Sequence, residues 1–164
     1  MMEWIDTHCH IDGEEFDDDR EQVIQRAREA GVSKMLVPGI DQKSSERIVQ
    51  LCRHYPDSLY PMVGLHPEEV KNDWRQQLDA IRPMLADGIT AIGEVGLDYY
   101  WSREYEQEQL EAFEQQVQWS VESRLPLMIH CRKAQNELVG ILKKYIDDLP
   151  GGVFHCFTGN EHEA

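Results

Sequence analysis

The feature that most constrains the fold is an alternation of apolar, β-branched segments with amphipathic helical segments, in which no hairpin turn joins two apolar segments. We expect strands over residues 3–10, 34–40, 59–66, 88–98, 125–132 and 151–157. We expect helices over residues 17–30, 44–55, 74–86, 104–124 and 134–148. Pro83 is expected to bend or break the third helix. Because strands joined through helices run parallel, the pattern predicts an α/β fold with a parallel sheet covered by helices.

Two architectures fit such a pattern, an open doubly wound sheet and a closed eight-stranded barrel. The sequence contains neither GxGxxG nor a P-loop, either of which would have favoured the open sheet. The 164 residues offer six strand segments, whereas a closed barrel has eight strands and about 250 residues. We therefore expect residues 1–164 to form one domain that is an incomplete barrel, truncated after the sixth strand.

Most of the seven histidines lie where predicted strands end. Five are at or next to the C-terminal ends of these strands, namely His8, His10, His66, His130 and His155. Glu94 lies near the end of another strand, inside an apolar segment. In parallel barrels functional groups project from these ends, whereas histidines that merely fill a core lie scattered on helix faces, as we expect for His54. The placement predicts a functional site at one edge of the sheet.

These residue types indicate a metal site. On an extended strand His8 and His10 share a face and aim at one point, although such pairs also occur in loops. A lone histidine beside apolar residues, such as His155, is more often a hydrogen-bonded core residue than a ligand. The carboxylate of Glu94 is harder to explain in that way, because a buried carboxylate is unfavourable unless it is paired, protonated or bound to a cation. Together these groups favour metal binding.

Imidazole and carboxylate ligands suit Zn²⁺ or Mn²⁺, and carboxylate-rich sites also accept Mg²⁺. If Glu94 bridges two ions, His8 and His10 can hold one of them while His130 and His155 hold the second. Such a pair of divalent ions polarises a phosphoryl or carbonyl oxygen and lowers the pKa of a bound water toward about 7. Hydrolysis is the chemistry that this arrangement predicts.

Five segments resemble, in order and over essentially the whole chain, the TatD-type metal-dependent deoxyribonucleases: IDTHCHID, GLHPEEV, AIGEVGLDYY, LPLMIHCRKA and GGVFHCFTG. The resemblance implies a (β/α)8 barrel of the amidohydrolase superfamily that hydrolyses DNA, in some members as a 3′–5′ exonuclease on single strands. It also implies that His8 and His10 bind the first metal, that His130 and His155 bind the second, and that Glu94 binds both. The family's remaining ligand is an aspartate of a late strand, which we expect to lie outside this chain. Activity of the chain alone is therefore expected to be impaired.

Two further residues are candidates for contact with the substrate. Arg132 follows His130 by two residues and is expected to bind a substrate phosphate, with a surface salt bridge as the alternative. His66 either contacts the substrate or packs structurally. Asp98 follows Glu94 and is expected to order the loop or to orient a ligand.

Charge excludes one class of partner. The 31 acidic and 16 basic residues give a net charge of −15, which argues against nucleic-acid binding through a broad basic surface. A nuclease remains compatible with this charge, because divalent cations in a pocket attract phosphate locally. Without an apolar run of about 20 residues or a hydrophobic leader, we expect a cytoplasmic protein with no membrane partner. The cysteines are expected to be reduced and buried, facing away from the histidines that precede them.

DNA is thus the expected substrate, and two alternatives stay open. One is a superfamily hydrolase that cleaves an ester or amide in a small molecule or an aminoacyl-tRNA. The other is an inactive chain that binds metal. Because an incomplete barrel exposes unpaired strands, we also expect self-association through its open edges.

Overall fold

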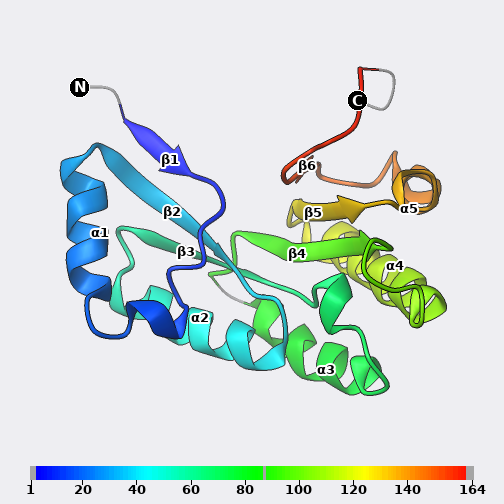
Figure 1. Cartoon of the computed structure of the whole chain (residues 1–164), viewed down its shortest axis with the longest axis horizontal. Helices are drawn as coiled ribbons and strands as arrows, with labels where there is room; N and C mark the ends of the chain where they lie inside the picture. The colour runs from blue at the N-terminus through cyan, green and yellow to red at the C-terminus, as the bar shows by residue number, and fades with distance from the viewer. Residues whose placement is uncertain (1–2, 87, 162–164) are drawn as a thin grey trace.

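The structure is a computed structural model, and it describes residues 3–86 and 88–161. One parallel sheet contains six strands that follow one another in chain order (Figure 1). They are β1 (Trp4–Asp6), β2 (Val32–Pro38), β3 (Leu59–Val63), β4 (Ala91–Asp98), β5 (Leu127–Arg132) and β6 (Gly152–Phe154). The sheet curls into an open barrel, in which β1 and β6 form the two edges. The predicted parallel α/β fold of barrel type is confirmed.

Helices follow the strands and cover the outer face of the sheet (Figure 1). They are α1 (Arg20–Glu29), α2 (Gln42–His54), α3 (Trp74–Ile81), α4 (Glu106–Ser123) and α5 (Gln135–Leu142). The third helix continues as a 3₁₀ segment over Arg82–Ala86, because Pro83 cannot donate the backbone hydrogen bond of an α-helix. None of the described helices combines the length and the apolar character that crossing a bilayer requires.

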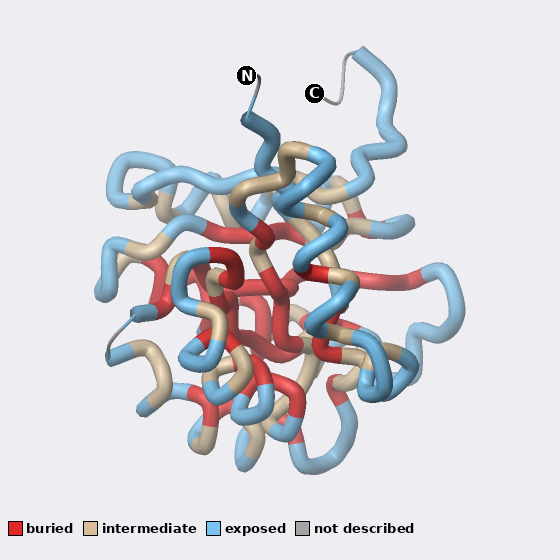
Figure 2. Tube along the Cα trace, turned by 90° about the vertical axis from the view of Figure 1, so that its left-hand side faces the viewer, coloured by how far each residue is buried: buried red, intermediate tan, exposed pale blue. Residues whose placement is uncertain are grey.

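The core lies between the sheet and the helices, and it is deepest around β4. All eight residues of this strand are buried, whereas the edge strand β1 is exposed throughout. The largest apolar cluster packs β4 against α4 through residues such as Ile92, Phe113 and Val117. Figure 2 shows the buried segments gathered in the interior and both ends of the described chain exposed. A carboxylate on β4 is therefore held in the least solvated part of the molecule.

Two buried glutamines of α4 fasten that helix to the ends of β3 and β4. The Gln116 side chain accepts a hydrogen bond from the Leu65 amide at 2.8 Å and donates one to the Leu65 carbonyl at 3.2 Å. Gln109 does the same for Asp98, at 2.9 and 3.2 Å. Since each amide side chain satisfies both polar groups of one peptide segment, the loops that follow these strands are fixed on the helix.

Four predicted strands extend past the observed strand ends. The first was expected to reach His10, but β1 ends at Asp6, and the last ends at Phe154 rather than at residue 157. The strands expected to end at residues 40 and 66 end at Pro38 and Val63. The Cys9 amide still donates to the Leu36 carbonyl at 3.0 Å, so the chain stays beside β2 after the strand ends. The Asp6 carboxylate accepts the His8 backbone N–H at 3.1 Å, which turns the chain there. His8 and His10 consequently lie in a loop, not on the face of a strand.

Candidate active site

The structure brings the predicted site residues into one cavity of about 530 Å³ at the C-terminal edge of the sheet. Its lining includes His8, His10, His66, Glu94, His130, Arg132 and His155. They come from the loops after β1, β3 and β6 and from β4 and β5 themselves. Segments far apart in the sequence meet here because the C-terminal ends of neighbouring parallel strands lie at the same edge.

The carboxylate of Glu94 is at the centre of this cavity, and histidines from three other segments surround it. His130 Nδ1 lies 3.0 Å from Oε1, and His8 Nε2 lies 3.3 Å from Oε2. His66 Nε2 is 3.8 Å from Oε1. The Glu94 side chain is only 6% exposed, so its charge is offset by these imidazoles rather than by water.

The two remaining histidines, His10 and His155, contact His8 rather than the Glu94 carboxylate. The His10 Nε2 atom lies 3.2 Å from the His8 Nε2 atom, and the His155 ring stacks on the His8 ring with 3.6 Å between centroids. The side chains form two sets of possible metal ligands, and within each set the donor atoms lie within 4.8 Å of one another. One set is His8, Glu94 and His155, and the other is His66, Glu94 and His130. The carboxylate belongs to both sets. The pairing of His130 with His155 on one ion, expected from the sequence, stays a prediction.

Burial and charge set the protonation of these groups. Burial alone would raise the Glu94 pKa, but hydrogen bonds with His130 and His8 hold that pKa well below its usual range. Burial and the neighbouring His130 lower the pKa of His66 to about 4. Burial and the neighbouring His8 lower the pKa of His155. At neutral pH the site therefore offers a charged carboxylate together with the neutral imidazoles of His66 and His155, which are the forms that bind a cation.

The donor set fits a divalent metal ion. Neutral imidazoles and one shared carboxylate are ligands that Zn²⁺ and Mn²⁺ accept readily. His8 Nδ1 is buried and makes no hydrogen bond to any described residue, so the polar capacity of this cluster is not used up within the protein. These residues therefore fit the divalent metal ion that the sequence predicts.

Asp98 orients His130, as expected from its place after Glu94. Its Oδ2 lies 2.8 Å from His130 Nε2, and its Oδ1 accepts the Tyr100 amide hydrogen bond at 2.9 Å. Burial by itself would lower the His130 pKa, but hydrogen bonds with Glu94 and Asp98 raise it. A carboxylate that holds the second ring nitrogen of a ligand histidine fixes the orientation of the ring.

Arg132 lies at the mouth of the same cavity, on aromatic rings. Its guanidinium is 3.6 Å from the Tyr100 ring centroid and 5.4 Å from that of Trp101. Among the described residues its side chain has these ring contacts and no ion pair. The surface salt bridge that was the alternative is therefore absent from the described part of the chain, and Arg132 lines the cavity.

Sequence reasoning missed Glu68, which lines the cavity from the 3₁₀ segment Pro67–Glu69. The Glu68 backbone N–H donates to His66 Nδ1 at 3.2 Å and so orients that ring. Its position two residues after His66 in GLHPEEV is the one signal that could have indicated it.

The cysteines differ in part from the expectation that they are buried and face away from the site. None of the four, which all lie in the described part of the chain, forms a disulfide. Cys131 meets the expectation that it faces away, because its thiol donates to Gln135 Oε1 of α5 at 3.2 Å, but Cys156 is exposed and lines the cavity. The expectation assumed an extended backbone, in which neighbouring side chains alternate. Cys156 has a φ of 46°, so the chain has already turned at that residue and the alternation no longer holds.

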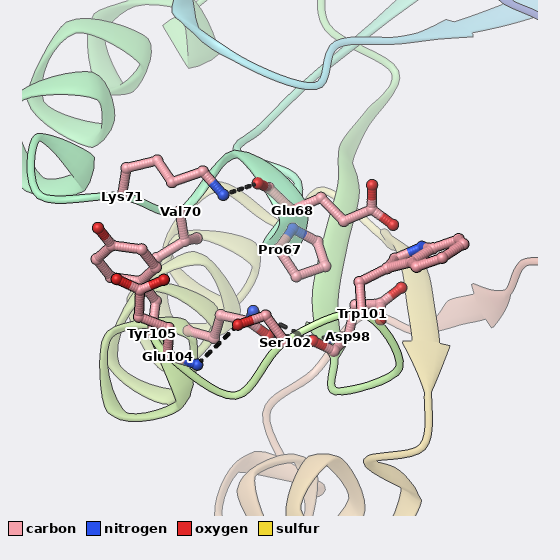
Figure 3. Close-up of a pocket in the computed structure, with 10 residues that line it drawn as sticks. Pro67, Glu68, Val70, Lys71, Asp98, Trp101, Ser102, Glu104 and Tyr105 are labelled. Carbon is pink, nitrogen blue, oxygen red and sulfur yellow. Dashed lines mark hydrogen bonds between the residues drawn. The ribbon is translucent and has the colours of Figure 1, made fainter.

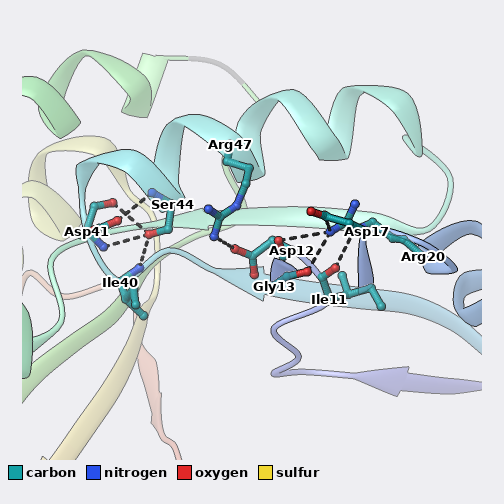
Figure 4. A network of polar contacts seen from close by, with 9 residues as sticks. All are labelled: Ile11, Asp12, Gly13, Asp17, Arg20, Ile40, Asp41, Ser44 and Arg47. Carbon is teal, nitrogen blue, oxygen red and sulfur yellow. Dashed lines mark hydrogen bonds and ion pairs between the residues drawn. The ribbon is translucent and has the colours of Figure 1, made fainter. Parts of the chain in front are cut away.

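An ion-pair network that the sequence analysis also missed holds the loop after His10 (Figure 4). The Arg47 guanidinium of α2 donates to the buried Asp12 carboxylate at 2.6 Å. Arg20 of α1 donates to the Ile11 and Gly13 carbonyls at 2.8 and 2.9 Å. Because side chains of α1 and α2 both bond to the segment that begins at residue 11, they also restrict the position of His8 and His10, which precede it.

The chain is similar in sequence to known proteins over nearly its whole length. A family model described as TatD related DNase matches residues 5–164. A Bacillus subtilis protein, described as uncharacterized metal-dependent hydrolase YabD, is 36% identical over 98% of this chain and 63% of its own length. The 3′-5′ ssDNA/RNA exonuclease TatD of Pectobacterium carotovorum is 36% identical over 97% of this chain and 62% of its own length.

A solved structure agrees with these sequence matches. The crystal structure of YJJV, a TatD homologue from Escherichia coli, matches with a TM-score of 0.90 and 33% identity over 98% of this chain and 62% of that chain. The chain thus spans less than two thirds of the length of these relatives.

Proposed function

Since the chain belongs to the TatD-related DNase family, we propose that the protein is a metal-dependent hydrolase of DNA phosphodiester bonds that acts as a 3′–5′ exonuclease on single strands. The observation that carries this proposal is the buried Glu94 carboxylate, with histidines from the loops after β1 and β3 and from β5 within 3.8 Å. A relative that shares 36% identity is named as an exonuclease for single-stranded DNA and RNA.

The proposed cofactor is a pair of divalent ions, Mg²⁺, Mn²⁺ or Zn²⁺. Five residues are assigned as their ligands: His8, His10, Glu94, His130 and His155. When bound, such ions lower the pKa of a coordinated water toward about 7 and neutralise charge on a phosphoryl oxygen. Glu94 is assigned to both ions because its two oxygens lie beside different ligand histidines, Oε1 beside His130 at 3.0 Å and Oε2 beside His8 at 3.3 Å.

Arg132 and His66 are assigned to the substrate. The Arg132 guanidinium is held by the Tyr100 ring at 3.6 Å and is positioned to bind a phosphate oxygen beside the cavity. The His66 ring is neutral at pH 7, and its Nδ1 accepts the Glu68 amide, so Nε2 carries the proton. Nε2 lies 3.8 Å from Glu94 Oε1, and His66 lines the cavity. We therefore assign this N–H as a hydrogen-bond donor to an oxygen of the substrate.

We also propose that residues 1–164 belong to one barrel domain and that the protein works in a reducing compartment such as the cytoplasm. The continuous six-stranded sheet supports the first assignment. The four cysteines, none of which forms a disulfide in the described part of the chain, support the second, because thiols persist in reducing compartments.

Digestion of 5′-labelled single-stranded DNA with Mg²⁺ or Mn²⁺ tests the proposal, with EDTA and Glu94→Ala as controls. We expect products that shorten from the 3′ end, that require the metal and that Glu94→Ala abolishes. If this chain and a chain extended past residue 164 both leave the DNA intact, the nuclease proposal is wrong. A panel of small-molecule and aminoacyl esters and amides would then be tested in its place.

A further inference from the structure

We propose that Tyr100 and Trp101 form, beside Arg132, a stacking platform that receives one unpaired nucleobase of the substrate, in a pocket next to the histidine cavity. This inference rests on the proposed function, because it assumes a nucleic-acid substrate. It adds a binding site for the base to the groups that contact the phosphate.

Trp101 is unusually exposed for a tryptophan. The residue is 70% exposed, more than any other large apolar residue in the described part of the chain, and the adjacent Tyr100 is 48% exposed. The two rings meet edge to face, with centroids 4.8 Å apart and an interplanar angle of 88°. Adjacent aromatic rings left in water mark a surface that another molecule covers.

Trp101 also lines a pocket of about 380 Å³ (Figure 3). Trp101 lies at one end of this pocket, Tyr105 and Lys71 lie at the other end, and Pro67 is between them. The Lys71 ammonium is 5.6 Å from the Tyr105 ring centroid. The lining thus combines aromatic and apolar side chains with several polar and charged ones, a mixture that can stack on a planar heterocycle and hydrogen-bond its edge.

The charges around the pocket favour a base over a phosphate inside it. Glu68 and Glu104 contribute carboxylates to the lining, and these repel a phosphate but accept hydrogen bonds from the amino or imino groups of a base. On the other side of the aromatic pair, Arg132 stacks on Tyr100 and lines the histidine cavity. The phosphate and the base of one nucleotide thus have separate, chemically matched places.

The pocket and the histidine cavity are neighbours. Glu68 forms part of the lining of both, and Arg132 contacts the Trp101 ring at 5.4 Å while lining the cavity. Asp98 lines the pocket and also holds His130 at 2.8 Å. A base seated on Trp101 would belong to a nucleotide whose phosphate is within reach of the site. Bases inside a duplex are paired and stacked on both faces, so the platform favours single strands.

Equilibrium binding measured by fluorescence anisotropy tests the platform without catalysis. The chain, loaded with Mn²⁺, is titrated into a labelled oligothymidylate whose phosphorothioate linkages resist cleavage and into an abasic oligomer with the same linkages. We expect Trp101→Ala to weaken oligothymidylate binding by roughly 10-fold and to leave abasic binding unchanged. Trp101→Phe should retain most of the affinity. Trp4→Ala is the matched control, because Trp4 is 57% exposed on β1, away from the site.

The outcomes separate the two proposals. If the unaltered chain binds neither oligomer, the nucleic-acid function and the platform both fall. If it binds oligothymidylate but Trp101→Ala binds equally well, the platform alone is wrong. Equal losses on both oligomers would also overturn it, because a stacking contact cannot act on a strand without bases. Circular dichroism verifies that the variants are folded.

Discussion

At the scale of single residues, Glu94 determines what the cavity can do. A carboxylate in a wholly buried strand would be protonated in apolar surroundings, yet its pKa is lowered because imidazoles contact both oxygens. His66 and His155 remain neutral, since burial and neighbouring histidines lower their pKa. The result is a negative carboxylate in a cluster that includes two neutral imidazoles, which favours a divalent cation.

Replacing Glu94 by alanine should therefore remove the metal. We expect Glu94→Ala to weaken Mn²⁺ binding by more than about 100-fold, because the only carboxylate common to both donor sets is lost. Isothermal titration with Mn²⁺ measures this loss. His54→Ala is the control, because this exposed histidine of α2 contacts only the Gln50 carbonyl, at 2.9 Å, among the described residues. Unchanged stoichiometry in Glu94→Ala would contradict the bridging role.

The five cavity histidines and Glu94 could be predicted from the sequence because each is a metal-binding type placed where a strand ends. Arg47 and Asp12 could not, since nothing in the sequence shows that residues 35 positions apart form an ion pair. Trp101 could not be predicted either. In a sequence an exposed tryptophan looks the same as a core tryptophan such as Trp119, and only the structure separates the two.

At the scale of elements, the close approach of β4 and β5 places Glu94 beside His130. Gly96 has a φ of 149° and pairs with His130 across the two strands. A Cβ at Gly96 would overlap the His130 carbonyl oxygen. Glycine at this position is required by both the backbone conformation and the space.

Gly96→Ala should destabilise the fold by about 3 kcal/mol, because β5 must move away from β4. Gly140→Ala is the matched control in α5, where an added Cβ meets nothing within 4 Å. That control should stabilise the protein by about 0.5–1 kcal/mol, as alanine does in helix interiors. Urea denaturation measures both free energies of unfolding. Equal effects of the two substitutions would refute the steric argument.

The buried glutamines of α4 give a second prediction at this scale. Gln116→Leu keeps the helix but leaves the Leu65 N–H and carbonyl without their partner, so we expect a loss of about 2 kcal/mol in unfolding free energy. The neighbouring Gln115 is exposed, and Gln115→Leu should change stability by less than about 0.5 kcal/mol. Thermal unfolding followed by circular dichroism compares the two. A Gln116→Leu variant as stable as the unaltered chain would show that the hydrogen bonds between Gln116 and Leu65 do not contribute to stability.

At the scale of the whole molecule, the open sheet is the dominant feature. Trp4 and Ile5 on β1 and Val153 on β6 are each more than half exposed, although their strands carry backbone groups that could pair. Unpaired strand edges with apolar side chains are templates for association. The net charge of −15 opposes contact between copies of the chain, so the salt concentration should control the equilibrium between monomers and associated chains.

We predict that the isolated chain self-associates through these edges. Light scattering coupled to size exclusion should show a mass that increases with protein concentration and with ionic strength, because salt screens the repulsion. Ile5→Lys should reduce the association by placing a charge on the edge. A monomer at every concentration, with a sharp thermal transition, would argue against this prediction.

By itself, the sequence determined the parallel α/β barrel fold, the approximate positions of its elements and the residue types that gather at the strand ends. Each of these follows from local periodicity and from the chemistry of single side chains. Only the tertiary structure decided that His8 and His10 meet from a loop, that His66 joins Glu94 and His130, and that Arg132 rests on Tyr100. Such facts depend on distances between segments remote in sequence, which the packing of strands and helices sets and no local pattern encodes.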